Sequence, residues 1–542
     1  LALQLLASLP RSRLALVQQQ ITPLLQFDIV GTLPAELALQ VLSHLPAPTL
    51  LLCGLVNKQW QRLANDQSLW KTLCASRGWS WRTPPNASQP PRGNRRLRRR
   101  GEYDSRWDHS DDEGIGDSDS DYEPEPSAPA LTVDSVEEAK AELTQMHVEL
   151  DTMAIQSSLG LKNKASQRSR HSAPVGFNAA SDPGSARRKP DYKLLHQTHV
   201  RLRNRFLTQS YRLSPLQTKG SLNNGGHTST VYCLQLYTYP DTGRQVLFTG
   251  SRDRTIREWN LGTRMVERVI SGVHTSSVLS ICVGDGYLAS AGSDKRVGLW
   301  NVNTNELVKV LSDHEDSVLC VRFNEEYLVS CSKDRTVRVY SFPDLDPLFV
   351  LDEHRAAVNT VSLSGSYICT GSGDRSIRLW SAKTGKCLRT FDNHHSRGIA
   401  SIDLKPPIVI SGSSDKHIRL FDVTTLQGWS TSPDHINPPA HQAKKLLPPL
   451  PPTSSVAPWH HNGLVRSVLL NDDFVISGSY DLSVKVWDRM SGMLIADLTG
   501  PHTGRVFCVA ADYTKIVSCG EDQTICIWDF SHGIDTSFVQ LC

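Results

Sequence analysis

The sequence predicts a multidomain protein, with a small all-α domain near the amino end and an all-β domain of seven repeats that fills the carboxyl-terminal half. Three observations predict this fold class. From residue 227 onward, an aspartate is followed six residues later by an aromatic residue, seven times over. Between residues 32 and 71, large apolar residues recur at helical spacing between prolines. The stretch that separates the two domains is rich in Pro, Ser and charge, which predicts a largely disordered linker.

The repeated aspartates define the larger domain. Successive aspartates lie 40 or 41 residues apart, except for one gap of 66 residues across a proline-rich insertion at 424–458. A fixed period of this length indicates that each repeat forms one supersecondary unit. The aspartate and aromatic pairs are Asp253/Trp259, Asp294/Trp300, Asp334/Tyr340, Asp374/Trp380, Asp415/Phe421, Asp481/Trp487 and Asp522/Trp528.

Each repeat also carries a histidine and a hydroxyl residue. The histidines are His227, His274, His314, His354, His395, His461 and His502, and the hydroxyl residues are Thr249, Ser290, Ser330, Thr370, Ser411, Ser477 and Ser518. We expect the aspartate to accept a hydrogen bond from the imidazole, the imidazole to bond the hydroxyl, and the hydroxyl to accept from the indole N–H. Phe421 has no donor, and Tyr340 replaces an indole only if its hydroxyl reaches the serine.

This four-position pattern resembles the WD-repeat family over about residues 214–530. The resemblance implies a seven-bladed β-propeller, which we assign to residues 214–535. Because an unpaired last blade would expose a sheet edge, residues near 215–222 are expected to supply its outer strand. A catalytic site would occur once, whereas His, Ser and Asp recur in every repeat, so no enzyme activity is expected.

The twelve cysteines include no CxxC pair, and we expect neither a metal nor another cofactor. Cys233, Cys320 and Cys508 each follow a loop histidine by six residues. A position that recurs with the repeat is predicted to be a buried strand position, where cysteine acts as a small apolar residue.

Residues 31–81 form the small helical domain. Pro34 suits a first helical position and Pro46 ends that helix, while the density of apolar residues in so small a domain indicates a partner surface. The segment resembles the F-box in its Leu33-Pro34 opening, its Val56-to-Trp60 stretch and its Leu69-Trp70 end. The resemblance implies binding to the adaptor protein of a ubiquitin ligase and, through it, to cullin and RING subunits. The contact positions it implies are Leu33, Pro34, Leu37, Leu42, Leu45, Leu51, Val56 and Trp60. The alternative is that some of them, Trp60 especially, pack the domain itself.

Residues 1–30 carry apolar residues three to four apart and are similar to the dimerisation segment of some F-box/WD-repeat proteins. This resemblance favours homodimerisation, the alternative being a helix packed on its own F-box.

The linker at 82–190 contains a basic block, an acidic block and one expected helix near 135–159. The basic block is either a nuclear import signal or a solvated tract, so the expected location is the nucleus, the cytoplasm or both. Residues 191–212 resemble the connector helix of this family, with Leu195, Leu202 and Phe206 on one face.

The substrate site is expected where the loop holding each histidine meets the turn before each aspartate. Blades six, seven and one are neighbours in a closed ring, so Arg466, Arg505 and Arg252 are predicted to converge with Tyr480 and Tyr232, and Lys333 holds the equivalent turn in blade three. Clustered guanidinium groups suit a phosphorylated peptide. The alternative is that these arginines are solvated rim residues. The insertion at 424–458 is either a lid over this face or a tolerated loop.

These patterns together predict a substrate receptor of a ubiquitin ligase, with a non-degradative scaffold protein as the alternative. The 58 basic and 55 acidic residues nearly balance, so no nucleic-acid partner is expected. The sequence contains no stretch of about 20 apolar residues, so no membrane partner is expected either.

Overall fold

The computed structural model describes residues 28–82, 190–220, 225–432 and 460–541, together with Pro10, Arg13 and Ala15. The predicted dimerisation segment before residue 28, the linker with its helix near 135–159, and residues 433–459 of the insertion lie outside the described residues. The chain divides into two compact units. In the described part, the first holds residues 28–82, 190–200 and 536–540, and the second holds residues 201–535. No helix within these residues is long and apolar enough to span a membrane.

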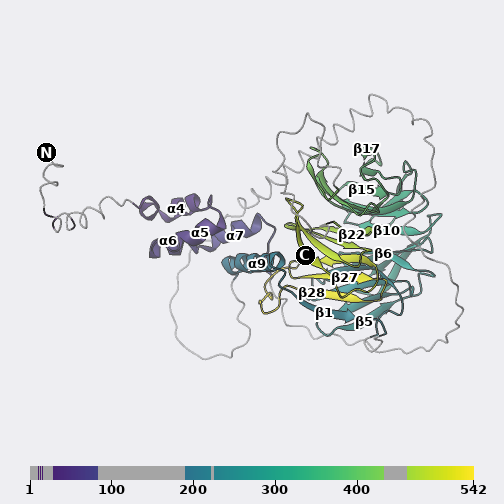
Figure 1. The fold of residues 1–542 in the computed structure, drawn as a ribbon, viewed down its shortest axis with the longest axis horizontal. Helices are drawn as coiled ribbons and strands as arrows, with labels where there is room; N and C mark the ends of the chain where they lie inside the picture. Colours follow the sequence, from purple (N-terminus) through teal and green to yellow (C-terminus); the bar gives the residue numbers. More distant parts are fainter. Residues whose placement is uncertain are drawn as a thin grey trace, which may run out of the picture. The chain divides into compact units, whose positions relative to one another are not determined.

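The first unit is built on five short helices, drawn in purple in Figure 1. They are α3 (Ile29–Thr32), α4 (Ala35–Leu42), α5 (Ala47–Cys53), α6 (Lys58–Ala64) and α7 (Gln67–Ala75). Asn57 and Asp66 cap the amino ends of α6 and α7 through their side chains. Leu42, Leu50 and Trp70 are almost fully buried in the shared core. Pro34 precedes the first turn of α4 rather than occupying it, because its backbone is still extended.

Helix α9 (Tyr192–Leu207) contributes residues to both units. Within the first unit, His199 stacks on Trp79 with ring centroids 4.3 Å apart, and His196 meets the same ring edge-on at 5.4 Å. Within the second unit, Phe206 stacks on Phe530 at 3.8 Å. Leu195, Leu202 and Phe206 are all buried, so they share one face of the helix, as their spacing predicts.

A segment close to the last residues of the chain also belongs to the first unit. Trp81 and Val539 form an antiparallel β-bridge, and the ring of Phe538 stacks on Trp81 at 4.7 Å. Phe538 and Val539 are buried. The small helical domain is therefore completed by residues from the far end of the sequence, a contact that no sequence pattern predicts.

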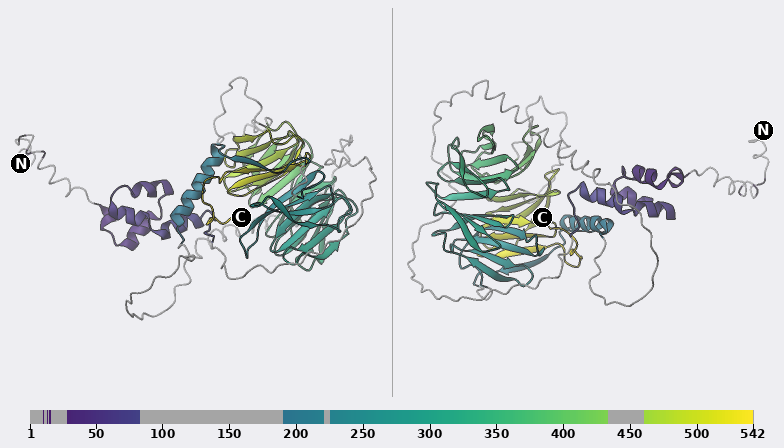
Figure 2. Two further views of the ribbon diagram at one scale, coloured as in Figure 1. Left: turned by 90° about the horizontal axis from the view of Figure 1, so that it is seen from below. Right: turned by 180° about the vertical axis from the view of Figure 1, so that it is seen from behind.

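The second unit is a propeller of seven four-stranded antiparallel sheets, seen from two further sides in Figure 2. Blade one is β2 (Val231–Thr238), β3 (Gln245–Ser251), β4 (Ile256–Asn260) and β5 (Met265–Ile270). Blade two is β6 (Val278–Gly284), β7 (Tyr287–Gly292), β8 (Val297–Asn301) and β9 (Glu306–Leu311). Blade three is β10 (Val318–Phe323), β11 (Tyr327–Ser332), β12 (Val337–Ser341) and β13 (Pro347–Leu351). Blade four is β14 (Val358–Ser364), β15 (Tyr367–Ser372), β16 (Ile377–Ser381) and β17 (Cys387–Phe391).

Blade five is β18 (Ile399–Lys405), β19 (Ile408–Ser413), β20 (Ile418–Asp422) and β21 (Gly428–Ser430). Blade six is β22 (Val465–Leu470), β23 (Phe474–Ser479), β24 (Val484–Asp488) and β25 (Leu494–Leu498). Blade seven is β26 (Val506–Ala511), β27 (Lys515–Gly520) and β28 (Ile525–Asp529), completed by β1 (Arg212–Gln217).

The ring closes through β1, which pairs with β28 so that Leu213 faces Trp528. The expectation that residues before the first blade complete the last one is confirmed, although the strand begins three residues earlier than expected. Closure removes the sheet edge that blade seven would otherwise leave unpaired.

The start of the predicted insertion differs from the structure. Gly428–Ser430 forms β21, the outer strand of blade five, and it lies inside the range 424–458. The extra residues therefore begin after the blade is complete and not within it. The prolines that marked the insertion all lie beyond the described part of that range.

Candidate functional site

Two loops of every blade meet at one end of the propeller. In blade one, the backbone N–H of Arg252, which precedes the repeat aspartate, donates to the carbonyl of Thr230 at 2.9 Å. The same bond recurs in the other blades, as Ser293 to Ser277, Lys333 to Ser317, Gly373 to Ala357, Ser414 to Gly398, Tyr480 to Leu464 and Glu521 to Arg505. This end of the ring, called the rim below, is the face on which the sequence places the substrate site.

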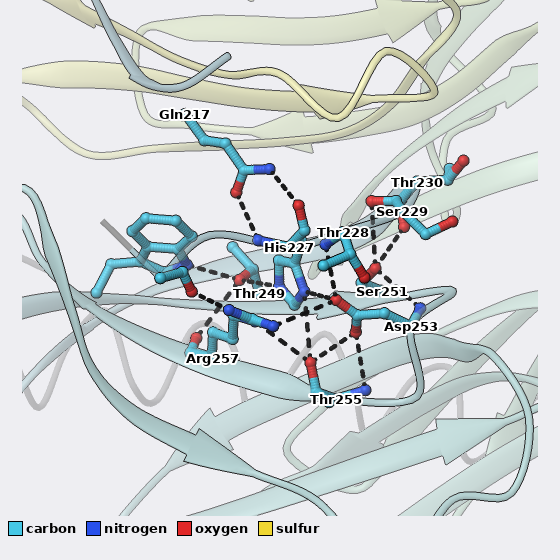
Figure 3. Close-up of polar contacts among 12 residues, drawn as sticks. Gln217, His227, Thr228, Ser229, Thr230, Thr249, Ser251, Asp253, Thr255 and Arg257 are labelled. Atoms are coloured by element: carbon cyan, nitrogen blue, oxygen red, sulfur yellow. Dashed lines mark hydrogen bonds and ion pairs between the residues drawn. The ribbon is translucent and has the colours of Figure 1, made fainter. Parts of the chain in front are cut away.

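The loops are held by the predicted side-chain network, drawn for blade one in Figure 3. His227 Nδ1 lies 2.8 Å from Asp253 Oδ2, and His227 Nε2 lies 2.8 Å from Thr249 Oγ1. The indole N–H of Trp259 donates to the same hydroxyl oxygen at 2.8 Å. Burial is the largest single effect and opposes ionisation of Asp253, but the hydrogen bond and charge of His227, with further hydrogen bonds from Thr255 and Thr228, together outweigh it and hold the pKa of the carboxyl below its usual value. Each such network fixes a loop without leaving buried polar atoms unpaired.

The tetrad is complete in blades one, four and six, where Trp259, Trp380 and Trp487 donate to the hydroxyl. Phe421 offers no donor, as predicted. The hydroxyl of Tyr340 donates to Asp313 at 2.8 Å and so does not take the place of an indole on Ser330. Blade two is also incomplete, which its sequence does not predict: the indole nitrogen of Trp300 is buried with no hydrogen-bond partner among the described residues.

A row of aromatic side chains crosses blades six, seven and one. We call it the aromatic rim, and it consists of Tyr232, Tyr480 and Phe507 together with Arg505, which pairs with Glu521. Phe507 contacts Tyr232 at a centroid distance of 5.2 Å and Tyr480 at 5.5 Å. The guanidinium of Arg505 lies 5.2 Å from the Tyr480 centroid, and its Nε is 3.7 Å from a carboxylate oxygen of Glu521. The structure thus brings Tyr232, Tyr480 and Arg505 together, as the sequence predicted.

The other predicted substrate residues lie at the same end of the propeller, on other turns and strands. Arg252 and Lys333 are exposed on the turns of blades one and three, and Arg466 is half-buried on β22. Phe507 was missing from the predicted site residues, although its place five residues after a loop histidine marked it as a rim position.

The helical domain presents a second candidate site. Six large apolar side chains on α4, α5 and the segment before α6 face solvent, and Leu55 and Val56 are 80% and 61% exposed. We call this group the apolar face, which consists of Leu37, Val41, Leu51, Leu52, Leu55 and Val56. Exposed apolar patches of this kind mark interaction surfaces.

The predicted adaptor contacts divide between this face and the interior. Leu37, Leu51 and Val56 belong to the apolar face, and Pro34 is exposed beside it. Leu42 is only 1% exposed and packs the core, whereas the prediction placed it among the contact residues. On an eight-residue helix, Leu37 and Leu42 fall on opposite sides.

Trp60, Leu45 and Leu33 are half-buried. Trp60 and Leu45 pack against the core, and the Trp60 indole N–H donates to Asp28 at 2.9 Å. Asp28 also accepts from the backbone of Gly31 at 2.8 Å and caps α3. These hydrogen bonds keep the pKa of the Asp28 carboxyl below its usual value, with the Gly31 bond as the largest cause. This contact agrees with the alternative that Trp60 packs its own domain.

Across the described ranges, no group of three or more His, Cys, Asp or Glu side chains is arranged to hold a metal ion. The cysteines of those ranges are free thiols, and most are buried.

Comparison with family models agrees with this architecture. An F-box-like model matches residues 30–76, and the model described as WD domain, G-beta repeat matches six stretches, at 217–260, 305–341, 345–381, 385–422, 454–488 and 492–529. Strands β6, β7 and β8 of blade two lie between the first two of these stretches, so this blade is defined by its strand pairing and its His274–Asp294 pair.

Curated relatives match parts of the chain. F-box/WD repeat-containing protein pof1 of Schizosaccharomyces pombe is 27% identical over 271 residues, which are 48% of this chain and 37% of that protein. An F-box protein of Saccharomyces cerevisiae is 32% identical over 62 residues, 11% of this chain and 10% of its own. Zinc finger CCCH domain-containing protein 17 of Oryza sativa is 33% identical over 102 residues, 18% and 22% of the two chains.

The matched stretches thus span at most 37% of the length of these relatives. The helical domain matches one family model, and the six stretches matched by the other include strands of all seven blades. The chain is an F-box/WD-repeat protein, in which an F-box-like domain precedes a seven-bladed propeller.

Proposed function

We propose that this protein is the substrate-recognition subunit of an SCF-type ubiquitin ligase. The observation that carries the proposal is the apolar face of the F-box-like domain, with six exposed large apolar side chains between residues 37 and 56. Water solvates such a face poorly, so it gains free energy when a partner protein covers it. In this proposal the chain binds the adaptor and the substrate but carries out no chemistry. The cullin and RING subunits recruited through the adaptor bring about ubiquitin transfer.

The proposed adaptor contacts are Leu37, Leu51 and Val56 from the predicted set, together with Val41, Leu52 and Leu55. They lie on α4, on α5 and in the segment that leads into α6. Asn57 and Asp28 support this arrangement, because the Asn57 side chain caps α6 and donates to Asp28 at 3.2 Å. This bond ties the start of α3 to the start of α6, directly after Val56.

The proposed substrate site is the aromatic rim, with Arg252, Arg466 and Lys333 as further cationic positions around the propeller mouth. A phosphorylated substrate suits Arg505, because phosphate and guanidinium form bidentate, charge-assisted bonds. Glu521 already pairs with Arg505, so an incoming anion must displace that carboxylate. Both side chains are about half exposed, and such a pair contributes at most about 1 kcal/mol. A phosphate therefore competes better than a second carboxylate.

Homodimerisation through residues 1–30 and residence in the nucleus, the cytoplasm or both are part of the same proposal. Their support is the apolar spacing before the F-box and the arginine-rich block in the linker.

The adaptor step is tested with the full chain, because residues 190–200 and 536–540 complete the helical domain. We expect wild type to co-purify with the adaptor and cullin, and the double substitution Leu55→Asp/Val56→Asp to weaken adaptor binding at least tenfold. The matched control is Met490→Asp/Met493→Asp, which alters two exposed apolar residues of blade six. Equal adaptor binding by both double variants would contradict the proposal and favour a scaffold protein outside the ligase.

The substrate step is tested by affinity capture from cell extract, before and after phosphatase treatment. Arg505→Glu is expected to lose the phosphatase-sensitive partners, whereas Glu521→Gln is expected to retain them and to bind them more tightly. Capture that is insensitive to phosphatase and to Arg505→Glu would contradict a phosphorylated substrate while leaving the adaptor step intact.

A further inference from the structure

One pair of facing positions, close to the start of the inner strand, recurs in all seven blades. Its members are direct antiparallel partners on the inner strand and on the strand beside it. The pairs are Cys233 with Gly250, Ser280 with Ala291, Cys320 with Cys331, Thr360 with Gly371, Ser401 with Gly412, Ser467 with Gly478, and Cys508 with Cys519. Five blades therefore place glycine or alanine opposite a small side chain, and two place cysteine there.

The glycines show how little space this position offers. A Cβ added to Gly250 would lie 2.6 Å from the sulfur of Cys233, and one added to Gly412 would lie 2.7 Å from the hydroxyl oxygen of Ser401. The γ atom of the inner-strand residue thus fills the space beside its partner. In blades three and seven a cysteine stands at this position, directly opposite the cysteine of the inner strand.

The backbone geometry of such a pair suits a covalent bond. Facing residues of an antiparallel pair have Cα atoms roughly 4.5–5.5 Å apart. A disulfide spans Cα separations of about 4.4–6.8 Å. Cys320 and Cys331 are facing residues in the ladder of β10 and β11, so no strand has to move for their sulfur atoms to bond.

The surroundings distinguish the pair in blade three. The hydroxyl of Ser280 donates to the Cys320 sulfur at 3.8 Å, and the protonated form of that sulfur can donate to the carbonyl of Val361 at 3.6 Å. The facing side chain of Cys331, together with the nearby guanidinium of Arg322, lowers the pKa of Cys320 against the effect of burial. Burial raises the pKa of Cys331. Of the two thiols, Cys320 is therefore the one whose ionisation is favoured.

In blade seven the two facing cysteines show no such difference in the direction of their pKa shifts. Burial raises the pKa of both Cys508 and Cys519. The second pair is therefore an internal control, with the same strand register and without the activated thiolate.

We propose that Cys320 and Cys331 form a reversible disulfide in response to hydrogen peroxide. The Cys320 thiolate attacks one peroxide oxygen, the O–O bond breaks, and hydroxide leaves and takes up a proton to give water and a sulfenic acid. The sulfur of Cys331 then attacks the sulfenic sulfur, the S–O bond breaks and the S–S bond forms. The displaced oxygen leaves as a second water with the Cys331 proton. Peroxide is reduced to two waters while two thiols are oxidised. Cys320 is 6% exposed, which favours an oxidant as small as peroxide. This proposal is independent of the ligase function.

The test uses the full chain, treated with hydrogen peroxide under native conditions, alkylated and digested with trypsin. Cleavage after Lys309, Arg322 and Lys333 separates the two cysteines, so a disulfide joins peptide 310–322 to peptide 323–333. We expect this linked pair at peroxide doses that leave peptide 506–515, which contains Cys508, unlinked, and we expect dithiothreitol to remove the link.

Two variants test the pair without changing the strand register. Cys331→Ser removes the sulfur that would close the disulfide but keeps a hydroxyl donor facing Cys320, so Cys320 should remain as a sulfenic acid that dimedone traps. Cys519→Ala, which copies the alanine of blade two, should leave the 310–322 to 323–333 link unchanged. The proposal is overturned if the link forms only after denaturation, if blade seven links at the same peroxide dose, or if dimedone fails to label Cys331→Ser.

Discussion

The hydroxyl of Tyr340 donates to Asp313 at 2.8 Å, and with this bond blade three departs from the tetrad that is complete in blades one, four and six. Ser330 still bonds His314 at 2.9 Å, so the loop remains held by its imidazole. The tyrosine ring is almost fully buried while Asp313 is exposed, and the bond therefore reaches from the core to the surface.

Tyr340→Phe is expected to lower the free energy of unfolding by about 1 kcal/mol, because it removes one hydrogen bond to a charged group and leaves the exposed carboxylate in water. Chemical denaturation of the full chain measures the change. Tyr287→Phe is the control, since no hydrogen bond of its hydroxyl is present in the described residues. An equal effect of both substitutions would contradict a role for the Asp313 bond.

The two tryptophans Trp300 and Trp259 test whether the indole bond stabilises a blade. Trp259→Phe breaks the bond to Thr249, whereas Trp300→Phe removes a buried N–H that has no partner among the described residues. Both lose similar apolar volume, so Trp259→Phe is expected to destabilise the protein by about 1–3 kcal/mol more. The difference between their thermal unfolding midpoints measures this. A larger loss for Trp300→Phe would show that the indole bond is not what the blade needs.

The histidines of α9 predict a stability that depends on pH. Burial lowers the pKa of His199 to about 4, and the neighbouring His196 adds to the effect. The unfolded chain binds this proton near the ordinary histidine pKa of about 6.5. Between these values the unfolded state holds more protons, so the stability due to His199 is present above pH 6.5 and is lost as the pH falls toward 4.

Unfolding of the helical domain, followed by tryptophan fluorescence between pH 7 and 4, measures this loss. His199→Gln should flatten the pH dependence, because the side chain no longer titrates, whereas His44→Gln, on an exposed residue, should leave it unchanged. An unchanged pH profile for His199→Gln would show that another group governs acid stability.

Leu37 lies at the surface of the F-box-like domain, whereas Leu42 lies in its core, so substitutions at the two positions are expected to have different effects. Leu42→Asp buries a carboxylate in the core and is expected to unfold the domain, at a cost of several kcal/mol. Leu37→Asp alters a side chain that is 49% exposed and should change stability by less than about 1 kcal/mol while weakening adaptor binding. Circular dichroism and adaptor binding of the full chain measure the two effects. Equal unfolding by both variants would contradict the assignment of the apolar face.

The seven blades were predictable because their chemistry is local. His274, Ser290, Asp294 and Trp300 all lie within one repeat, and the same spacing recurs in the other blades. The aromatic rim was partly predictable for the same reason, since Tyr232, Tyr480 and Arg505 hold fixed places relative to these markers. The pairing of Arg505 with Glu521 was not predictable, because it depends on how two exposed side chains meet across a turn.

A partner surface on the F-box-like domain was predicted, but its residues were predicted only in part. Leu37 and Leu42 were equal candidates and Leu55 was not among them, and only helix packing decides that Leu42 enters the core while Leu37 and Leu55 face solvent. Trp60 likewise gains its partner Asp28 from a residue 32 positions earlier.

The sequence by itself determined the order of domains, the number of blades and the strand that closes the ring, because these follow from repeated local hydrogen bonding and from the need to pair every sheet edge. Tertiary structure alone decided which leucines are exposed, where Tyr340 donates, and how Phe538 returns to Trp81. These contacts join residues that no repeat or helical period relates, so their free energy is fixed only when the chain has folded.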